Sequence, residues 1–132
     1  MKIDDPFLDD LTAQAKSNPR LRQCFDLRTT SEDTSQRMLN ALELGTVIPI
    51  HRHPTSSETM VMVRGKLIER FYDEAGNLTG EFLMEPCGKY PMVQIPAGQW
   101  HSLEVLESGT IIFEAKDGKY MPLGEEDVIT NK

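Results

Sequence analysis

The fold class of this chain of 132 residues is decided by residues 45–65, GTVIPIHRHPTSSETMVMVRG. Two runs rich in branched or apolar residues flank the turn-forming segment PTSS, a pattern typical of two strands joined by a turn. Side chains on a strand alternate between its two faces, so His51 and His53 project together, roughly 7 Å apart along the chain, and Arg52 projects the other way. The turn can then bring Glu58, the first residue of the next strand, beside His53.

The same pattern of short strands continues through most of the chain. Turn signals that contain Gly, Pro, Asn or Ser separate the strands, which recur about every ten residues, and no alternation of strands with helices is present. The eight expected strands are residues 36–42, 46–51, 58–63, 66–72, 81–85, 90–96, 101–107 and 110–116. This spacing predicts an all-β sandwich, jelly roll or small barrel.

A helical arm is expected to precede the strands. In residues 5–17, Asp5 can cap a helix and Pro6 suits its first turn. The apolar residues that recur at helical intervals are Leu8, Leu11 and Ala15. Residues 20–27 predict a further turn or short helix. We therefore divide the chain into a helical arm packing on the barrel (1–33), a barrel (34–124) and a loose C-terminal tail (125–132).

Composition argues against several classes of partner. The chain has 21 acidic and 14 basic residues, a net charge of −7, and no basic stripe. Nucleic acid and anionic membranes are therefore not expected as partners. Cys24 and Cys87 lack CxxC spacing, which favours reduced thiols, and no signal peptide or membrane span is predicted. We expect a soluble cytoplasmic protein.

All three histidines of the chain, His51, His53 and His101, fall where they could converge. An H-x-H pair on a strand is often only a polar surface pair, and His101, in the segment PAGQWH, could be a core histidine bonded to the backbone. Glu58 could likewise be a solvated turn residue. However, Glu58 opens the apolar run ETMVMV, and a carboxylate near the interior must be paired, protonated or metal-bound. These observations favour a metal site.

These segments resemble the motifs of the cupin superfamily. Residues 45–65 match the pattern G-x5-H-x-H-x4-E-x6-G at every fixed position, and residues 96–101 match P-x-G-x2-H. Two departures are seen in the second motif: seven residues instead of five separate Gly88 from Pro96, and Val105 replaces an asparagine. The resemblance implies a double-stranded β-helix, or jelly-roll barrel, that encloses one divalent transition metal: iron, manganese, nickel, zinc or cobalt. The implied ligands are His51, His53, Glu58 and His101.

A closer resemblance is to the small bacterial WbuC-type cupins, which are associated with surface-polysaccharide gene clusters. The segments that carry it are QR (36–37), HRHP (51–54), IPAGQWH (95–101) and EAKDGKY (114–120). It indicates Arg37, Lys116 and Tyr120 as further site residues. A cation beside a metal suits a carboxylate or phosphate ligand, although each could also be an ordinary surface side chain. The wider cupin resemblance also implies a homodimer.

Three functions stay open on the sequence alone. The first is a metal-dependent enzyme, isomerase- or oxygenase-like, that acts on a small sugar-like or anionic ligand in the barrel. In this case Glu58 could ligate the metal or serve as a general base. The second is a non-catalytic metal-containing module that binds or senses a small ligand. The third is a purely structural metal, with function on an oligomer surface.

Overall fold

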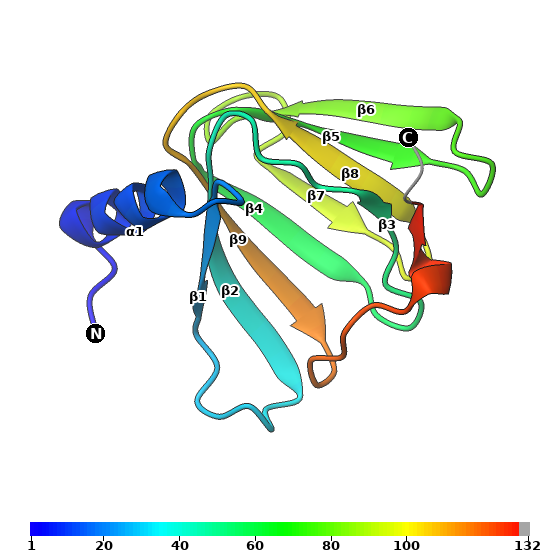
Figure 1. Cartoon of the computed structure of the whole chain (residues 1–132), viewed down its shortest axis with the longest axis horizontal. Coiled ribbons are helices and arrows are strands. Elements are labelled where there is room, and N and C mark those ends of the chain that lie inside the picture. Colours follow the sequence, from blue (N-terminus) through cyan, green and yellow to red (C-terminus); the bar gives the residue numbers. More distant parts are fainter. Residues whose placement is uncertain (130–132) are drawn as a thin grey trace.

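Residues 1–129 are described by the computed structural model, which has one α-helix, one short 3-10 helix and two five-stranded sheets (Figure 1). The elements are α1 (Asp5–Ser17), β1 (Arg22–Asp26), β2 (Ser35–Leu42), β3 (Ile50–His51), β4 (Glu58–Arg64), β5 (Leu67–Tyr72), β6 (Leu78–Met84), β7 (Met92–Ile95), β8 (Trp100–Val105), β9 (Thr110–Asp117), the 3-10 helix η1 (Glu125–Asp127) and β10 (Val128–Ile129).

The strands pair antiparallel in two sheets that face each other. Their orders are β1-β2-β9-β4-β7 and β10-β3-β8-β5-β6. Because consecutive strands often lie in different sheets, the chain crosses repeatedly between the layers, as it does in a jelly roll. The all-β prediction, with one N-terminal helix, is confirmed. Among the described residues, no helix has the length and hydropathy needed to cross a membrane.

The inward faces of the two sheets enclose the main core. On β4, Met60 and Met62 point inward, and they pack with Leu67 of β5, Met84 of β6 and Ile112 of β9. Their spacing of two along β4 is the period of a strand, and the intervening residues face outward. The core occupies one end of the space between the sheets. It leaves the ends of the strands that carry His51, Glu58 and His101 to form a cavity.

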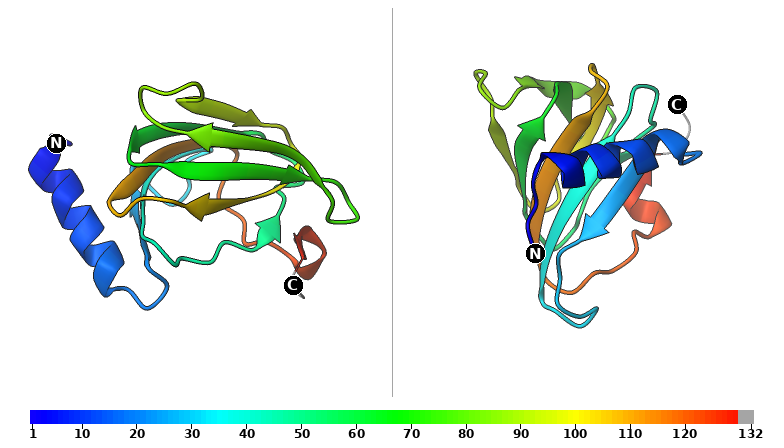
Figure 2. Two further views of the ribbon diagram at one scale, coloured as in Figure 1. Left: turned by 90° about the horizontal axis from the view of Figure 1, so that it is seen from above. Right: turned by 90° about the vertical axis from the view of Figure 1, so that its left-hand side faces the viewer.

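Helix α1 covers the outer face of the first sheet, where Figure 2 (right) shows it lying across β2 and β9. The predicted stripe is buried, and it packs on outward residues of the sheet: Leu8, Leu11 and Ala15 of α1 meet Leu39, Ala41 and Ile111. Arg64 adds two ion pairs, to Asp5 at 2.6 Å and to Asp9 at 2.8 Å. The helix thus protects a sheet face that would otherwise expose apolar surface.

Three local expectations differ from the structure. The cap of α1 is Asp4, whose side chain accepts a hydrogen bond from the Phe7 amide, and not Asp5. The turn or short helix expected within residues 20–27 is strand β1, which pairs along its whole length with β2. The tail is not loose over residues 125–129, because η1 leads into β10 and β10 pairs with β3. The last three residues of the expected tail lie outside the described part of the chain.

Gly65, the last fixed position of the first motif, makes the turn from β4 to β5. Its φ of +86° suits glycine, and a Cβ at this position would lie 2.2 Å from Thr110 Oγ1 and 2.6 Å from Thr110 Cα. A side chain would therefore meet the backbone of β9 as well as a side chain. The motif needs glycine here for close packing of the strands.

Candidate metal centre

The three histidines converge at one end of the space between the sheets. His51 on β3 is the register partner of His101 on β8, and His53 lies two residues beyond the end of β3. Their ring centroids are 4.3 Å apart for His51 and His101, and 5.2 Å apart for His51 and His53. One ring nitrogen from each histidine lies within 4.8 Å of the others. Three histidines held this closely can serve as ligands of a single metal ion.

Hydrogen bonds to the backbone orient two of these rings. His51 Nδ1 lies 2.9 Å from the Pro49 carbonyl oxygen, and His101 Nδ1 lies 3.0 Å from the Gln99 carbonyl oxygen. A carbonyl oxygen only accepts, so Nδ1 is the protonated nitrogen in both rings and Nε2 carries the free lone pair. Metal-bound histidines characteristically donate their second nitrogen to such a group, which fixes the ring and its tautomer.

The loop that carries His53 is held from two directions. Its carbonyl oxygen accepts a hydrogen bond of 2.8 Å from the Gly98 amide, in the PAG turn that precedes His101. Arg52 points away from the cluster, as expected, with its Nε 2.8 Å from Asp127 Oδ1 and its guanidinium 4.7 Å from the centroid of the Trp100 ring. These contacts fix the H-x-H segment against the second motif and against the C-terminal segment.

Glu58 completes the cluster from the opposite sheet. Its Oε1 lies 3.4 Å from His53 Nε2 and 3.8 Å from His101 Nε2. This oxygen is buried, and no hydrogen-bond partner for it exists within residues 1–129. An unsatisfied buried carboxylate oxygen that faces two imidazole nitrogens is the arrangement expected of a metal ligand, since a cation would supply the missing partner. The residues present therefore fit a divalent transition metal.

Burial keeps the imidazoles neutral. The pKa of each histidine is lowered to about 4, chiefly because burial disfavours the charged ring. For His51 the nearby His101 lowers the pKa further, and for His53 the charge of Lys116 does so. Neutral imidazole is the form that binds metal, so at neutral pH no proton has to leave these rings when an ion enters.

A cavity of about 310 Å³ opens beside the cluster. This volume is near the lower end of the range for small-molecule sites, ~300–1,000 Å³. Met60, Leu103 and Ile112 provide apolar wall. Polar lining residues that sequence reasoning missed are Arg22, Asn40, Glu69 and Glu114.

Glu114 lies on β9 two residues before Lys116, and side chains two apart on a strand face the same way. Both side chains therefore face the cavity. Asn40 Nδ2 donates a hydrogen bond to Glu114 Oε1, and Glu58 also bonds the Glu114 carboxyl. Burial and the neighbouring Glu58 raise the pKa of Glu114 well above its usual value. Two carboxyl groups can bond each other only by sharing a proton, and the raised pKa of Glu114 favours such a shared proton.

The three residues indicated by the closer resemblance have different positions. Lys116 lines the cavity and is the register partner of Glu58. Arg37 lies outside the cavity, where its guanidinium contacts Asp33 at 3.4 Å and the Ser35 carbonyl oxygen at 3.0 Å. Tyr120 is exposed and does not line the cavity. The structure therefore brings Lys116 to the cluster but not Arg37 or Tyr120.

Comparison with known proteins identifies a family and a fold. Residues 3–84 match the family model described as "Domain of unknown function (DUF6016)". The comparison with curated proteins gives no significant match.

Solved cupin structures have the same fold. KdgF from Halomonas sp. is 14% identical, with a TM-score of 0.61 over 78% of this chain and 84% of its own. The Cnp3 cupin domain from Schizosaccharomyces pombe is 12% identical, with a TM-score of 0.59 over 74% and 64%. The capsular polysaccharide assembling protein CapF from Staphylococcus aureus is 23% identical, with a TM-score of 0.62 over 75% of this chain but only 27% of its own. Identities this low show the fold alone, and the predicted jelly-roll barrel is confirmed.

Proposed function

The chain belongs to the DUF6016 family of domains of unknown function and has a cupin fold, and on this premise we propose that it is a small metal-dependent enzyme. The observation that carries the proposal is Oε1 of Glu58, which faces the nitrogens of His53 and His101 and has no hydrogen-bond partner in the part of the chain that the structure describes. His51, His53, Glu58 and His101 are the proposed ligands. The cavity beside them gives a small molecule access to the same point.

The cavity also provides groups that act on a bound ligand. A divalent ion held by the cluster would polarise a carbonyl or hydroxyl oxygen of that ligand. Lys116 lines the cavity and is the register partner of Glu58, so its positive charge lies beside the cluster. This charge attracts a carboxylate or phosphate of the ligand. The raised pKa of Glu114 favours a carboxyl proton beside Glu58, and such a proton can be exchanged with a ligand atom in the cavity. The apolar wall excludes water from the remaining contact surface.

These groups support a sugar-like or anionic substrate and an isomerase- or oxygenase-like reaction. We extend the proposal to the WbuC-type subfamily, surface-polysaccharide metabolism, a cytoplasmic location and a homodimer, which rest on the resemblance of the motif segments or on composition. The division into an arm, a barrel and a tail also stays a prediction, as do site roles for Arg37 and Tyr120. One feature favours the alternative of a non-catalytic binding module: the apolar wall and Lys116 alone could hold an anionic ligand.

The experiment that tests the proposal is metal analysis by elemental mass spectrometry on protein purified without an affinity tag or added metal. We expect about one equivalent of a transition metal in the wild type and none in the His51→Ala, His101→Ala double variant. Arg37→Gln, which lies outside the cavity, is the control and retains the metal. Iron would direct the search to oxygen consumption, whereas zinc or nickel would direct it to sugar isomerisation or ligand binding.

A contrary result is equally clear. Wild-type protein that takes up no iron, manganese, cobalt, nickel or zinc on reconstitution would refute the metal site. Protein that binds the metal and a ligand without converting any candidate substrate would favour the binding module.

A further inference from the structure

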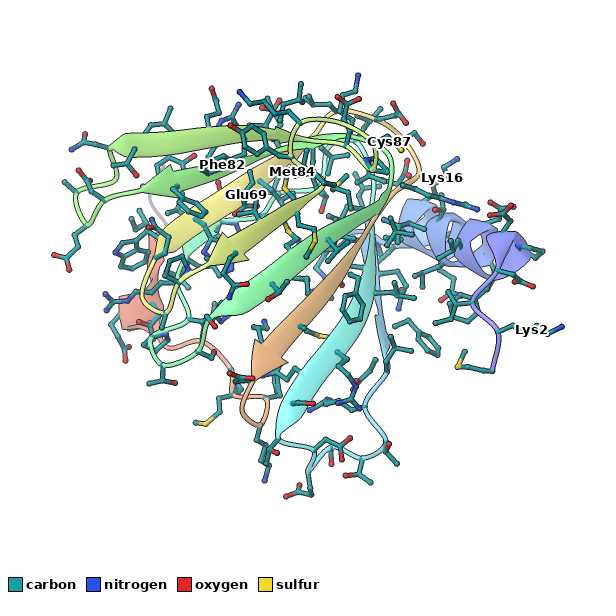
Figure 3. All side chains as sticks on the ribbon, turned by 180° about the vertical axis from the view of Figure 1, so that it is seen from behind. Lys2, Lys16, Glu69, Phe82, Met84 and Cys87 are labelled. Atoms are coloured by element: carbon teal, nitrogen blue, oxygen red, sulfur yellow. The ribbon has the colours of Figure 1, made fainter. Side chains whose placement is uncertain are left out.

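Glu69 is a fully buried carboxyl group for which the metal centre gives no role. It lies on β5 with 0% of its surface exposed, between the core residue Leu67 and Phe71, and it lines the cavity. Figure 3 labels it near Phe82, its register partner on β6. On the neighbouring strand β8, the register partner of Glu69 is Leu103, and the register partner of Phe71 is His101. Glu69 therefore lies deeper in the barrel than the histidines, by about 7 Å along the strand.

Both carboxyl oxygens of Glu69 lack a hydrogen-bond partner among the described residues, and no basic side chain in that part of the chain pairs with it. A buried polar group without a partner is unfavourable for folding and calls for an explanation. The explanation that fits a cavity-lining group is a ligand that supplies the missing hydrogen bonds.

A second cation is not the expected ligand. Within residues 1–129, the only group of histidine, cysteine and acidic side chains with at least three convergent donor atoms is formed by His51, His53 and His101. Glu69 is not a member of this group, so within residues 1–129 it belongs to no set of three or more such donors. Hard divalent cations need several oxygen ligands, and the described part of the chain does not gather three side-chain donors around Glu69.

An anionic group is not expected at Glu69 either. The acidic groups that act on it are Glu58 and Glu114, and a negative charge on this pair would repel a carboxylate or phosphate. Burial, and next the neighbouring Glu58 and Glu114, raise the pKa of Glu69 well above its usual value. A neutral carboxyl group both donates and accepts hydrogen bonds, and it is matched by a group that does the same. A ligand hydroxyl has this property.

We propose that Glu69 is a specificity residue, whose carboxyl binds uncharged hydroxyl groups of a polyhydroxy acid that reaches past the metal centre into the barrel. The acidic end of this ligand lies at Lys116 and the histidine cluster, and its hydroxyl groups lie at Glu69. The inference deepens the proposed function and rests on it for the position of the acidic end.

The test uses two probes that share a carboxylate and a six-membered ring: D-glucuronate, which carries hydroxyl groups, and cyclohexanecarboxylate, which carries none. Binding to metal-reconstituted protein is measured by calorimetry. We expect the wild type to prefer D-glucuronate. Glu69→Leu should lose about tenfold in affinity for D-glucuronate, the effect of one or two hydrogen bonds, and bind cyclohexanecarboxylate no more weakly. Glu69→Gln, which can still donate and accept, should keep the preference. The surface variant Glu81→Gln is the control.

Two further measurements make the result decisive. The melting temperature of Glu69→Leu should equal or exceed that of the wild type, because the variant removes a buried polar group without a partner. Glu69→Met, a second apolar variant, replaces it if the leucine variant does not fold. The proposal is overturned if wild-type protein does not prefer D-glucuronate, or if the apolar variant keeps the preference. Metal content, measured on each sample, tests the proposed function separately, because Glu69 is not a proposed ligand.

Discussion

Replacing Gly65 with alanine should destabilise the barrel far more than the same change at Gly76. Both glycines have a φ of +86°, so any side chain meets the same backbone strain at either position, about 1–2 kcal/mol. The positions differ in their surroundings. A Cβ at Gly76 meets nothing within 4 Å, whereas one at Gly65 lies 2.2 Å from Thr110 Oγ1 and 2.6 Å from Thr110 Cα.

The added cost at Gly65 cannot be relieved by a simple side-chain rotation. Thr110 is fully buried, and its hydroxyl donates to the Glu107 carbonyl oxygen at 2.7 Å and accepts from the Lys66 amide at 3.2 Å. The contact with its Cα requires the backbone of β9 to move, and such overpacking costs about 1–3 kcal/mol. We therefore expect about 2–5 kcal/mol for Gly65→Ala and about 1–2 kcal/mol for Gly76→Ala.

The two costs are measured by urea unfolding of each variant, followed by circular dichroism, with the slope of the transition checked for a common denatured state. For a chain of this size, each kcal/mol lowers the melting temperature by roughly 4 °C. Equal destabilisation of the two variants, within about 0.5 kcal/mol, would refute the reasoning, because it would mean that the strands do not approach closely at Gly65.

Three further predictions concern the cavity. Burial lowers the pKa of His51 to about 4, whereas the pKa of an unfolded histidine is about 6.5. Between these two pH values the unfolded state binds more protons than the folded state. His51 therefore makes metal-free protein less stable as the pH falls from about 6.5 to 4. The free energy of unfolding in urea, measured at pH 7, 6 and 5, should therefore fall less with decreasing pH for His51→Asn than for the wild type. The difference should reach about 1.4 kcal/mol per pH unit. Parallel plots of this free energy against pH for the two proteins would contradict the lowered pKa. Lys116→Gln should weaken cyclohexanecarboxylate binding about tenfold in calorimetry, as expected for a charge-assisted contact. Lys66→Gln, at a lysine that pairs with Glu85 outside the cavity, should leave binding unchanged, and equal effects would remove Lys116 as the anchor. Zinc at 100 times its dissociation constant should stabilise the wild type by about 2.7 kcal/mol in thermal unfolding, and a chelator should reverse the gain, but the His51→Ala, His101→Ala variant should show neither effect.

The sequence predicted the parts of the fold and the site that depend on local spacing. The H-x-H spacing was enough to place His51 beside His53, although β3 ends at His51, and the short PAG turn was enough to set His101 at the start of a strand. The apolar stripe of α1 followed from helical spacing in the same way. In each case the relevant residues lie within a few positions of one another, so local geometry determines the outcome.

The elements and residues that were missed depend on distant contacts. Strands β1 and β10 lack a strong local pattern and form by pairing with β2 and β3. The inward orientation of Glu69 depends on which face of β5 meets the opposite sheet, which no local signal fixes. The position of Arg37 also depends on which face of its strand meets the opposite sheet. Asn40 and Leu42 of β2 face the cavity, so Arg37, an odd number of residues from both, faces outward.

The hydrogen bonds that orient His51 and His101 have a consequence for how the protein tolerates mutation. Each acceptor is a main-chain carbonyl, at residues 49 and 99, and every amino acid supplies that oxygen. The orientation of the imidazoles is therefore encoded in the path of the chain. The residue at position 49 can change without disturbing the ring of His51, provided that the backbone keeps its course, whereas at position 99 the Gln99 side chain also donates to the Tyr72 and Trp100 carbonyl oxygens.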